Sequence, residues 1–343
     1  MRRISLSDLH PGSVLAKPVY GASGALRLNQ GKQITRQFLD SLSSWGIHSV
    51  YVDDGAPLPV VPEAMKATYY EAVGRIKVAM EILRRGSLVD AAALGSQLGE
   101  FVLQLAAEPC ALSCLHLLRE RDDYTFHHCI DVGIVAALAG KWLGFSGTDL
   151  LQLAMAGALH DLGKARLPLE ILNKPGRLTP EEFDVVKTHP LLGHELLTAE
   201  FGPGSVVARV ALEHHERTDG SGYPQGLRPA DTLLASRIVA MADVYDAMTS
   251  RRIYRDRSPE FAVLAQLQED SFGLLDPRVV GAFLEHVIHY AHGRRVRLSN
   301  GQIGRVVFIH EMAPTRPIVE VGVDLVDLMV RKDLSVVDEV DEE

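Results

Sequence analysis

The sequence has few of the residues that build disulfide-rich or zinc-ribbon folds. Only three cysteines, Cys110, Cys114 and Cys129, occur among 343 residues. An odd number without a Cys-x-x-Cys pair argues against a disulfide framework and against a zinc ribbon. We therefore expect free thiols within helices.

The chain also lacks long apolar runs and an excess of positive charge. No stretch approaches the roughly 18 consecutive apolar residues of a membrane span. The basic start has no apolar segment of a secretory signal, so we expect a cytoplasmic protein. The net charge of −9 makes a nucleic acid polymer a poor partner. A small anionic ligand remains possible, because a local group of arginines and lysines can bind it.

What is present is an ordinary globular composition, 47% hydrophobic and 23% charged. The turn residues and the apolar spacing predict a mainly α chain with two small flanking units. The expected divisions are a small α+β N-terminal unit at 1–57, a helical linker at 58–104, an all-helical bundle at 105–293 and a β-rich appendage at 294–343. The helix expected at Glu63–Arg85 offers either a homodimer contact or packing within the chain.

The helical region contains an unusual set of residues of the kind that bind metals. These are His128, His160, Asp161, His189, His214, His215 and Asp243. Asp161 directly follows an almost wholly apolar helix, where a carboxylate is costly unless it is paired or binds a metal. Asp243 lies in a similar helix, and His128 shares a helix face with valines and alanines.

Each of these residues has a plainer explanation when taken alone. A single core histidine is more often a hydrogen-bonded filler than a ligand, the His214-His215 pair could be exposed, and Asp243 could cap a neighbouring helix. Several buried helices that each bring an imidazole or a carboxylate to one region are, however, how helical bundles build metal sites. Mixed histidine and aspartate ligation suits Fe, Mn or Zn better than Mg or Ca.

A defined turn follows the histidine pair. Gly222-Tyr223-Pro224 ends a loop that begins at Asp219, and it presents an aromatic ring next to the histidines. Lys164, Arg252 and Arg255 are cations that could meet phosphate oxygens. The alternatives are a plain surface turn and solvated surface cations.

In combination, these motifs resemble the HD-GYP family of metal phosphohydrolases. His160-Asp161-Leu162-Gly163-Lys164 is similar to the HD signature, and His214-His215-Glu216, Asp219-Gly220 and Gly222-Tyr223-Pro224 are similar to the HD-GYP hallmark. The matching pieces run in order over roughly residues 105–293, from Tyr124-Thr125 to Arg252-Ile253-Tyr254-Arg255. One HD dipeptide alone would be weak, but the full ordered string is very specific.

The resemblance implies an all-helical HD domain that hydrolyses cyclic di-GMP to pGpG in bacterial second-messenger signalling, with further hydrolysis to GMP as the alternative. It implies a hydroxide bridging two metals as the nucleophile, with Asp161 as the bridging ligand and Lys164 at the nucleophile or a phosphate. The metal ligands that it implies are His128, His160, Asp161, His189, His214, His215 and Asp243. Gly222, Tyr223, Pro224, Arg252 and Arg255 would contact the substrate.

One position departs from a pattern found in some members of the family. Those members carry a glutamate four residues before the first histidine, where it helps to hold a third metal, and here that residue is Tyr124. We therefore expect two divalent metal ions, Fe or Mn. If the third metal is what carries the reaction on to GMP, the reaction should stop at pGpG.

Other functions remain open at this point. The domain could be a catalytically silent sensor that binds cyclic di-GMP and signals through a partner, although no ligand of the motif is lost. It could hydrolyse another cyclic dinucleotide such as cyclic GMP-AMP. It could also be an HD phosphohydrolase of other nucleotides, against which the Gly222-Tyr223-Pro224 loop argues.

Overall fold

The computed structural model describes most of the helical region and parts of the two flanking units. The described residues are 61–108, 110–118, 124–250, 260–287, 293–310, 313–322 and 324–340, and, before these, 2–6, 9, 13–15, 17–20, 26–28, 32, 34, 35, 38, 39, 41, 42, 45, 47 and 49–53. Among them, no helix has both the length and the apolar character needed to cross a membrane.

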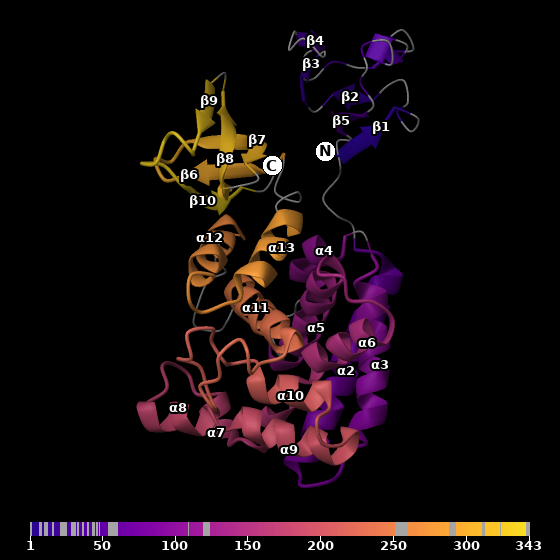
Figure 1. The fold of residues 1–343 in the computed structure, drawn as a ribbon, viewed down its shortest axis with the longest axis vertical. Coiled ribbons are helices and arrows are strands. Elements are labelled where there is room, and N and C mark those ends of the chain that lie inside the picture. The colour runs from indigo at the N-terminus through magenta and orange to yellow at the C-terminus, as the bar shows by residue number, and fades with distance from the viewer. Residues whose placement is uncertain are drawn as a thin grey trace.

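The described part of the chain is mainly helical, as predicted, and the helices share one large hydrophobic core. Figure 1 shows the helices as one domain with the two small units at the same end of it. In chain order the helices are α2 (Glu63–Arg84), α3 (Ala91–Leu105), α4 (Ala111–Leu118), α5 (Tyr124–Trp142), α6 (Gly147–Leu159), the 3-10 helix η1 (Leu162–Arg166), α7 (Leu169–Leu172), α8 (Pro180–Val186), α9 (His189–Phe201), α10 (Val206–Glu213), α11 (Leu234–Thr249), α12 (Glu260–Asp270) and α13 (Pro277–Val287).

Helix α5 lies at the centre of this core. It is buried nearly all round, as its apolar sequence predicted, and it contacts α2, α3, α6, α11 and α13. Its closest neighbour is α6, because two glycines let the backbones touch. A Cβ atom at Gly157 would lie 2.8 Å from the Cα atom of Gly133. This close approach brings the start of α5 and the end of α6 together at the site described below.

Helices α2 and α3 belong to the same core. Tyr69 and Ile76 on α2 and Leu98 on α3 are fully buried within it. The division expected at residue 104 therefore does not coincide with a break in packing. Residues 101–118 of the predicted helical region comprise the end of α3 and the separate helix α4.

The C-terminal unit is a five-stranded antiparallel sheet, in agreement with the β-rich expectation. Its order is β10 (Val336–Glu339), β6 (Arg295–Leu298), β7 (Ile303–His310), β8 (Ala313–Val321) and β9 (Asp324–Asp327). The sheet packs on α12, which places Phe261 in the core of the sheet. Pro314 and Pro317 are part of β8. The pairing of β7 with β8 is irregular here, and such irregularities are where a sheet tolerates proline.

The N-terminal unit contains short strands in two separate sheets. One sheet has the order β1 (Arg2–Ser5), β5 (Ser49–Asp53) and β2 (Val14–Leu15), and a separate pair joins β3 (Val19–Tyr20) to β4 (Leu26–Leu28). The neighbouring strands β2 and β3 thus belong to different sheets. Leu15, Ile34, Leu42 and Val52 form the small core of the unit.

Candidate metal centre

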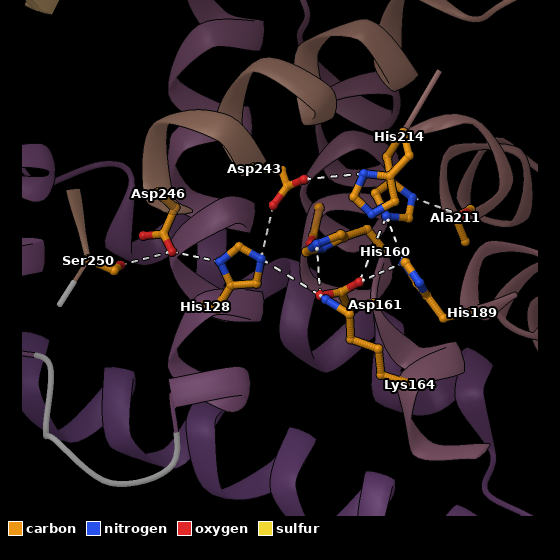
Figure 2. A network of polar contacts seen from close by, with 12 residues as sticks. His128, His160, Asp161, Lys164, His189, Ala211, His214, Asp243, Asp246 and Ser250 are labelled. Atoms are coloured by element: carbon orange, nitrogen blue, oxygen red, sulfur yellow. Dashed lines mark hydrogen bonds and ion pairs between the residues drawn. The ribbon is translucent and has the colours of Figure 1, made fainter. Parts of the chain in front are cut away.

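Five segments of the helical domain bring the seven predicted metal-type residues together (Figure 2). His128 lies on α5 and Asp243 lies on α11, while His189 begins α9. His160 and Asp161 directly follow α6, and His214-His215 directly follows α10. All of them except His215 and Asp243 are buried to at least 97%. Residues separated by more than a hundred positions thus meet at one buried place.

The seven residues form two groups that Asp161 joins. The first contains Asp161, His189, His214 and His215, and the second contains His128, His160 and Asp243; within each, one donor atom per residue lies within 4.8 Å of the others. Asp161 Oδ1 is 3.2 Å from His189 Nε2, whereas Asp161 Oδ2 is 3.4 Å from His160 Nε2 and 3.7 Å from His128 Nε2. The two oxygens of one carboxylate therefore face different groups, which is the arrangement of a bridging ligand.

Asp243 makes a second connection between the groups. Its Oδ1 lies 3.2 Å from His128 Nε2 and its Oδ2 lies 3.7 Å from His215 Nδ1. Because Asp243 is on α11 and His128 is on α5, this connection depends on the packing of those two helices.

Hydrogen bonds on the far side of the imidazoles orient them. His160 Nδ1 donates to the Gly157 carbonyl at 2.7 Å, and His189 Nδ1 donates to the Val186 carbonyl at 2.7 Å. His214 Nδ1 donates to the Ala211 carbonyl at 2.9 Å. A carbonyl can only accept, so each Nδ1 carries the hydrogen and each Nε2 is left as an electron-pair donor directed into the site.

Asp246 orients the imidazole of His128 in the same way. Its Oδ2 lies 2.6 Å from His128 Nδ1, and Ser250 Oγ donates to the same oxygen at 3.2 Å. Asp246 is fully buried one turn after Asp243. Asp246 is not among the residues predicted from the sequence, although a second carboxylate three residues after Asp243 in an apolar helix was a usable signal.

The protonation states of the acids fit cation binding. Burial acts to raise the pKa of Asp161, but Lys164 and His160 hold it well below its usual range. Burial likewise acts to raise the pKa of Asp243, and the hydrogen bond from His128 holds it well below its usual range. Both carboxylates are therefore ionised at neutral pH.

The histidines divide into two kinds. Burial lowers the pKa of His214 and lowers that of His215 to about 3, so both are neutral and able to donate an electron pair. Burial also acts to lower the pKa of His128, but Tyr124, Asp243 and Asp246 raise it well above its usual range. A cation bound at this position would displace the His128 proton.

Several buried polar atoms at the site have no hydrogen-bond partner, as expected if they contact a metal. These are His160 Nε2, Asp161 Oδ1 and His215 Nδ1. Leaving a buried donor or acceptor unsatisfied costs about 1–3 kcal/mol. All three atoms belong to residues of the two groups. A nitrogen and oxygen donor set suits Fe, Mn or Zn, so these residues fit divalent metal ions of that type.

Lys164 lies at the edge of the centre. It is on η1, and its ammonium donates to Asp161 Oδ2 while 22% of its side chain is exposed. Burial acts to lower the pKa of Lys164, but the charge of Asp161 raises it. Lys164 is therefore a charged group that connects the buried carboxylate with solvent.

The Gly222-Tyr223-Pro224 loop covers the histidine pair. The Tyr223 ring stacks on the His215 ring, with the centroids 4.6 Å apart at 28°. The loop passes so close to the chain before it that a Cβ atom at Gly222 would overlap the backbone of Glu216 and Arg217. Gly222 therefore allows the close approach that places Tyr223.

Glu216 holds this loop in position. Its side chain is 7% exposed, and its Oε1 and Oε2 accept hydrogen bonds of 2.8 Å from the backbone N–H groups of Gln225 and Leu227. In the sequence, Glu216 was identified only as part of the His214-His215-Glu216 motif. Its function as a clamp depends on the path of the loop, which no local pattern indicated.

Two of the predicted substrate contacts, Arg252 and Arg255, fall within 251–259, outside the described residues. Tyr124, which stands where some HD-GYP members have a glutamate, stacks its ring on His128 with the centroids 5.5 Å apart.

Comparison with known proteins shows which families and proteins this chain is similar to. The HD domain family matches residues 113–279. A cyclic di-GMP phosphodiesterase of Pseudomonas aeruginosa is 36% identical over 238 residues, which cover 69% of this chain and 57% of that protein. A 3'3'-cGAMP-specific phosphodiesterase of Vibrio cholerae is 34% identical over 162 residues, covering 47% of this chain and 35% of that protein.

One solved structure shows a similar fold. An HDG"Y"P protein from Bdellovibrio bacteriovorus superposes with a TM-score of 0.54 at 19% identity, covering 82% of this chain and 97% of that one. The chain spans about half or less of the length of the two curated relatives. It spans nearly all of the Bdellovibrio bacteriovorus structure.

Proposed function

We propose that this chain, whose residues 113–279 match the HD domain family, is a metal-dependent phosphodiesterase that hydrolyses cyclic di-GMP to pGpG. The observation that carries the proposal is the pair of buried histidine and aspartate groups that share Asp161. Two nearby metal sites with a common carboxylate suit the displacement of an oxygen at phosphorus.

We assign the seven residues to two divalent metal ions, Fe or Mn. His189, His214 and His215 would hold one ion, and His128, His160 and Asp243 would hold the other, with Asp161 between them. When bound, the two ions would supply Lewis-acid activation of water and of the phosphate. A Tyr124 ring stacked on His128, in place of a carboxylate, favours two ions over three and a reaction that stops at pGpG.

The chain's own groups would complete the reaction. The ammonium of Lys164 is directed at the Asp161 carboxylate from the side that reaches solvent, so it can neutralise charge that develops on the phosphate oxygens. Tyr223, held over His215 by the Glu216 clamp, would border the bound substrate. The leaving group is a ribose 3′-oxygen, and no side-chain nucleophile is needed.

Replacing the shared carboxylate tests the proposal. Asp161→Ala should abolish hydrolysis of cyclic di-GMP and remove bound metal together, because both groups lose a ligand. Metal content by elemental analysis and product separation by chromatography on anaerobically purified, Fe- or Mn-loaded protein measure the two effects. Full metal occupancy with full activity in the variant would contradict the assignment.

A second substrate is favoured by a specific observation. The similarity to a relative named as 3'3'-cGAMP-specific extends over 162 residues, so cyclic GMP-AMP is the alternative substrate to assay. Faster turnover of cyclic GMP-AMP than of cyclic di-GMP would replace the substrate assignment and keep the metal centre.

A further inference from the structure

Phe183 is an aromatic side chain that the proposed reaction does not use. It lies on α8 and is 47% exposed. A single exposed apolar side chain is common on protein surfaces, so exposure alone says little. Its location is the informative feature.

Helix α8 is capped at its start and contacts a predicted metal ligand at its end. Thr179 and Glu182 form a capping box at its start, and Lys174 pairs with Glu182 at 2.6 Å. At its end, the Val186 carbonyl accepts the 2.7 Å hydrogen bond from His189 Nδ1. Phe183 lies one turn before Val186, so its position is tied to that of a predicted metal ligand.

The rings of His215, Tyr223 and Phe183 contact one another in that order. Tyr223 stacks on His215 at 4.6 Å, and Phe183 meets Tyr223 edge to face, with the centroids 6.4 Å apart at 77°. Lys187 Nζ lies 5.3 Å from the centroid of the Phe183 ring and pairs with Asp184 at 2.5 Å. The Phe183 ring is therefore kept in place beside the Tyr223 loop while about half of it stays open to solvent.

We propose that Phe183 is the platform on which one purine base of a cyclic dinucleotide stacks while a phosphate lies at the metal centre. This inference rests on the proposed function and extends it to the base. Protein aromatic rings bind unpaired bases by stacking, which tolerates different bases because every base has a π-face. Phe183 should thus strengthen binding of cyclic di-GMP and of cyclic GMP-AMP to a similar extent.

The test separates binding from chemistry. In Phe183→Ala, KM and the calorimetric Kd for both dinucleotides should rise by roughly 5- to 150-fold, the equivalent of losing one stacked base. Because Phe183 does not contact the metal ligands directly, kcat and metal content should stay within about twofold of the wild type. Phe183→Trp should restore binding, and Phe183→Leu, which keeps apolar volume without a π-face, should not.

Phe272→Ala is the matched control. Phe272 is 86% exposed in the turn after α12, and removing its ring should leave KM and Kd unchanged. If Phe183→Ala or Phe183→Leu binds like the wild type while the wild type turns over cyclic dinucleotides, the platform is wrong and the proposed function stands. If the metal-loaded wild type neither binds nor hydrolyses either dinucleotide, the proposed function itself fails.

Discussion

The clamp formed by Glu216 gives a prediction whose size follows from the structure. Glu216 is 7% exposed, and its two carboxylate oxygens each accept one backbone hydrogen bond of 2.8 Å. In Glu216→Gln the carbonyl oxygen keeps one of these bonds, but the new NH₂ group faces an N–H donor. One buried backbone donor is then unsatisfied, which costs about 1–3 kcal/mol.

Two measurements should detect that loss. The free energy of unfolding should fall by about 1–3 kcal/mol, which for a domain of this size lowers Tm by roughly 2–4 °C per kcal/mol. Because the clamp places Tyr223 over His215, kcat/KM for cyclic di-GMP should also fall, by roughly 5- to 150-fold if the whole penalty is expressed in the transition state. Metal content at saturating metal should stay at the wild-type value, since no ligand is removed.

Glu195→Gln is the control for this substitution. Its side chain is 71% exposed and pairs with Arg166 at 3.4 Å on the surface, so the change should have little effect. If Glu216→Gln has the same free energy of unfolding and the same kcat/KM as the wild type, the clamp does not position the loop and the reasoning is refuted.

Three other changes test other parts of the structure. Asp246→Asn should weaken metal binding by roughly 10- to 100-fold in a chelator competition, and unchanged affinity would exclude its effect through His128. Gly163→Ala should destabilise the fold by about 1–3 kcal/mol in chemical denaturation, since a Cβ would overlap the backbone at the start of α9, whereas Gly281→Ala, which has open space, should not. Burial acts to raise the pKa of Asp276, but neighbouring arginines lower it below its ordinary 3.8. The difference in Tm between Asp276→Asn and the wild type should therefore have its full size at neutral pH. It should disappear as the pH falls through the folded-state pKa of Asp276.

Much of the candidate site could be predicted from the sequence. Histidine and aspartate interrupt segments that are otherwise apolar, such as the end of α6 and the middle of α11, and burial of such groups is costly without a partner. That contrast selected the seven residues that the structure brings together. The mainly helical fold followed from the spacing of the apolar residues.

The tertiary structure alone decided how these residues are arranged. His128 and Asp246 are 118 positions apart, and only the packing of α5 against α11 brings them to 2.6 Å. The assignment of the two Asp161 oxygens to different groups, the clamp of Glu216 and the place of Phe183 beside Tyr223 have the same origin. Sequence patterns report the local environment of each side chain, such as its burial and periodicity. The distances between side chains on different helices are set by how those helices pack, and here by the close approach that Gly133 and Gly157 allow between α5 and α6.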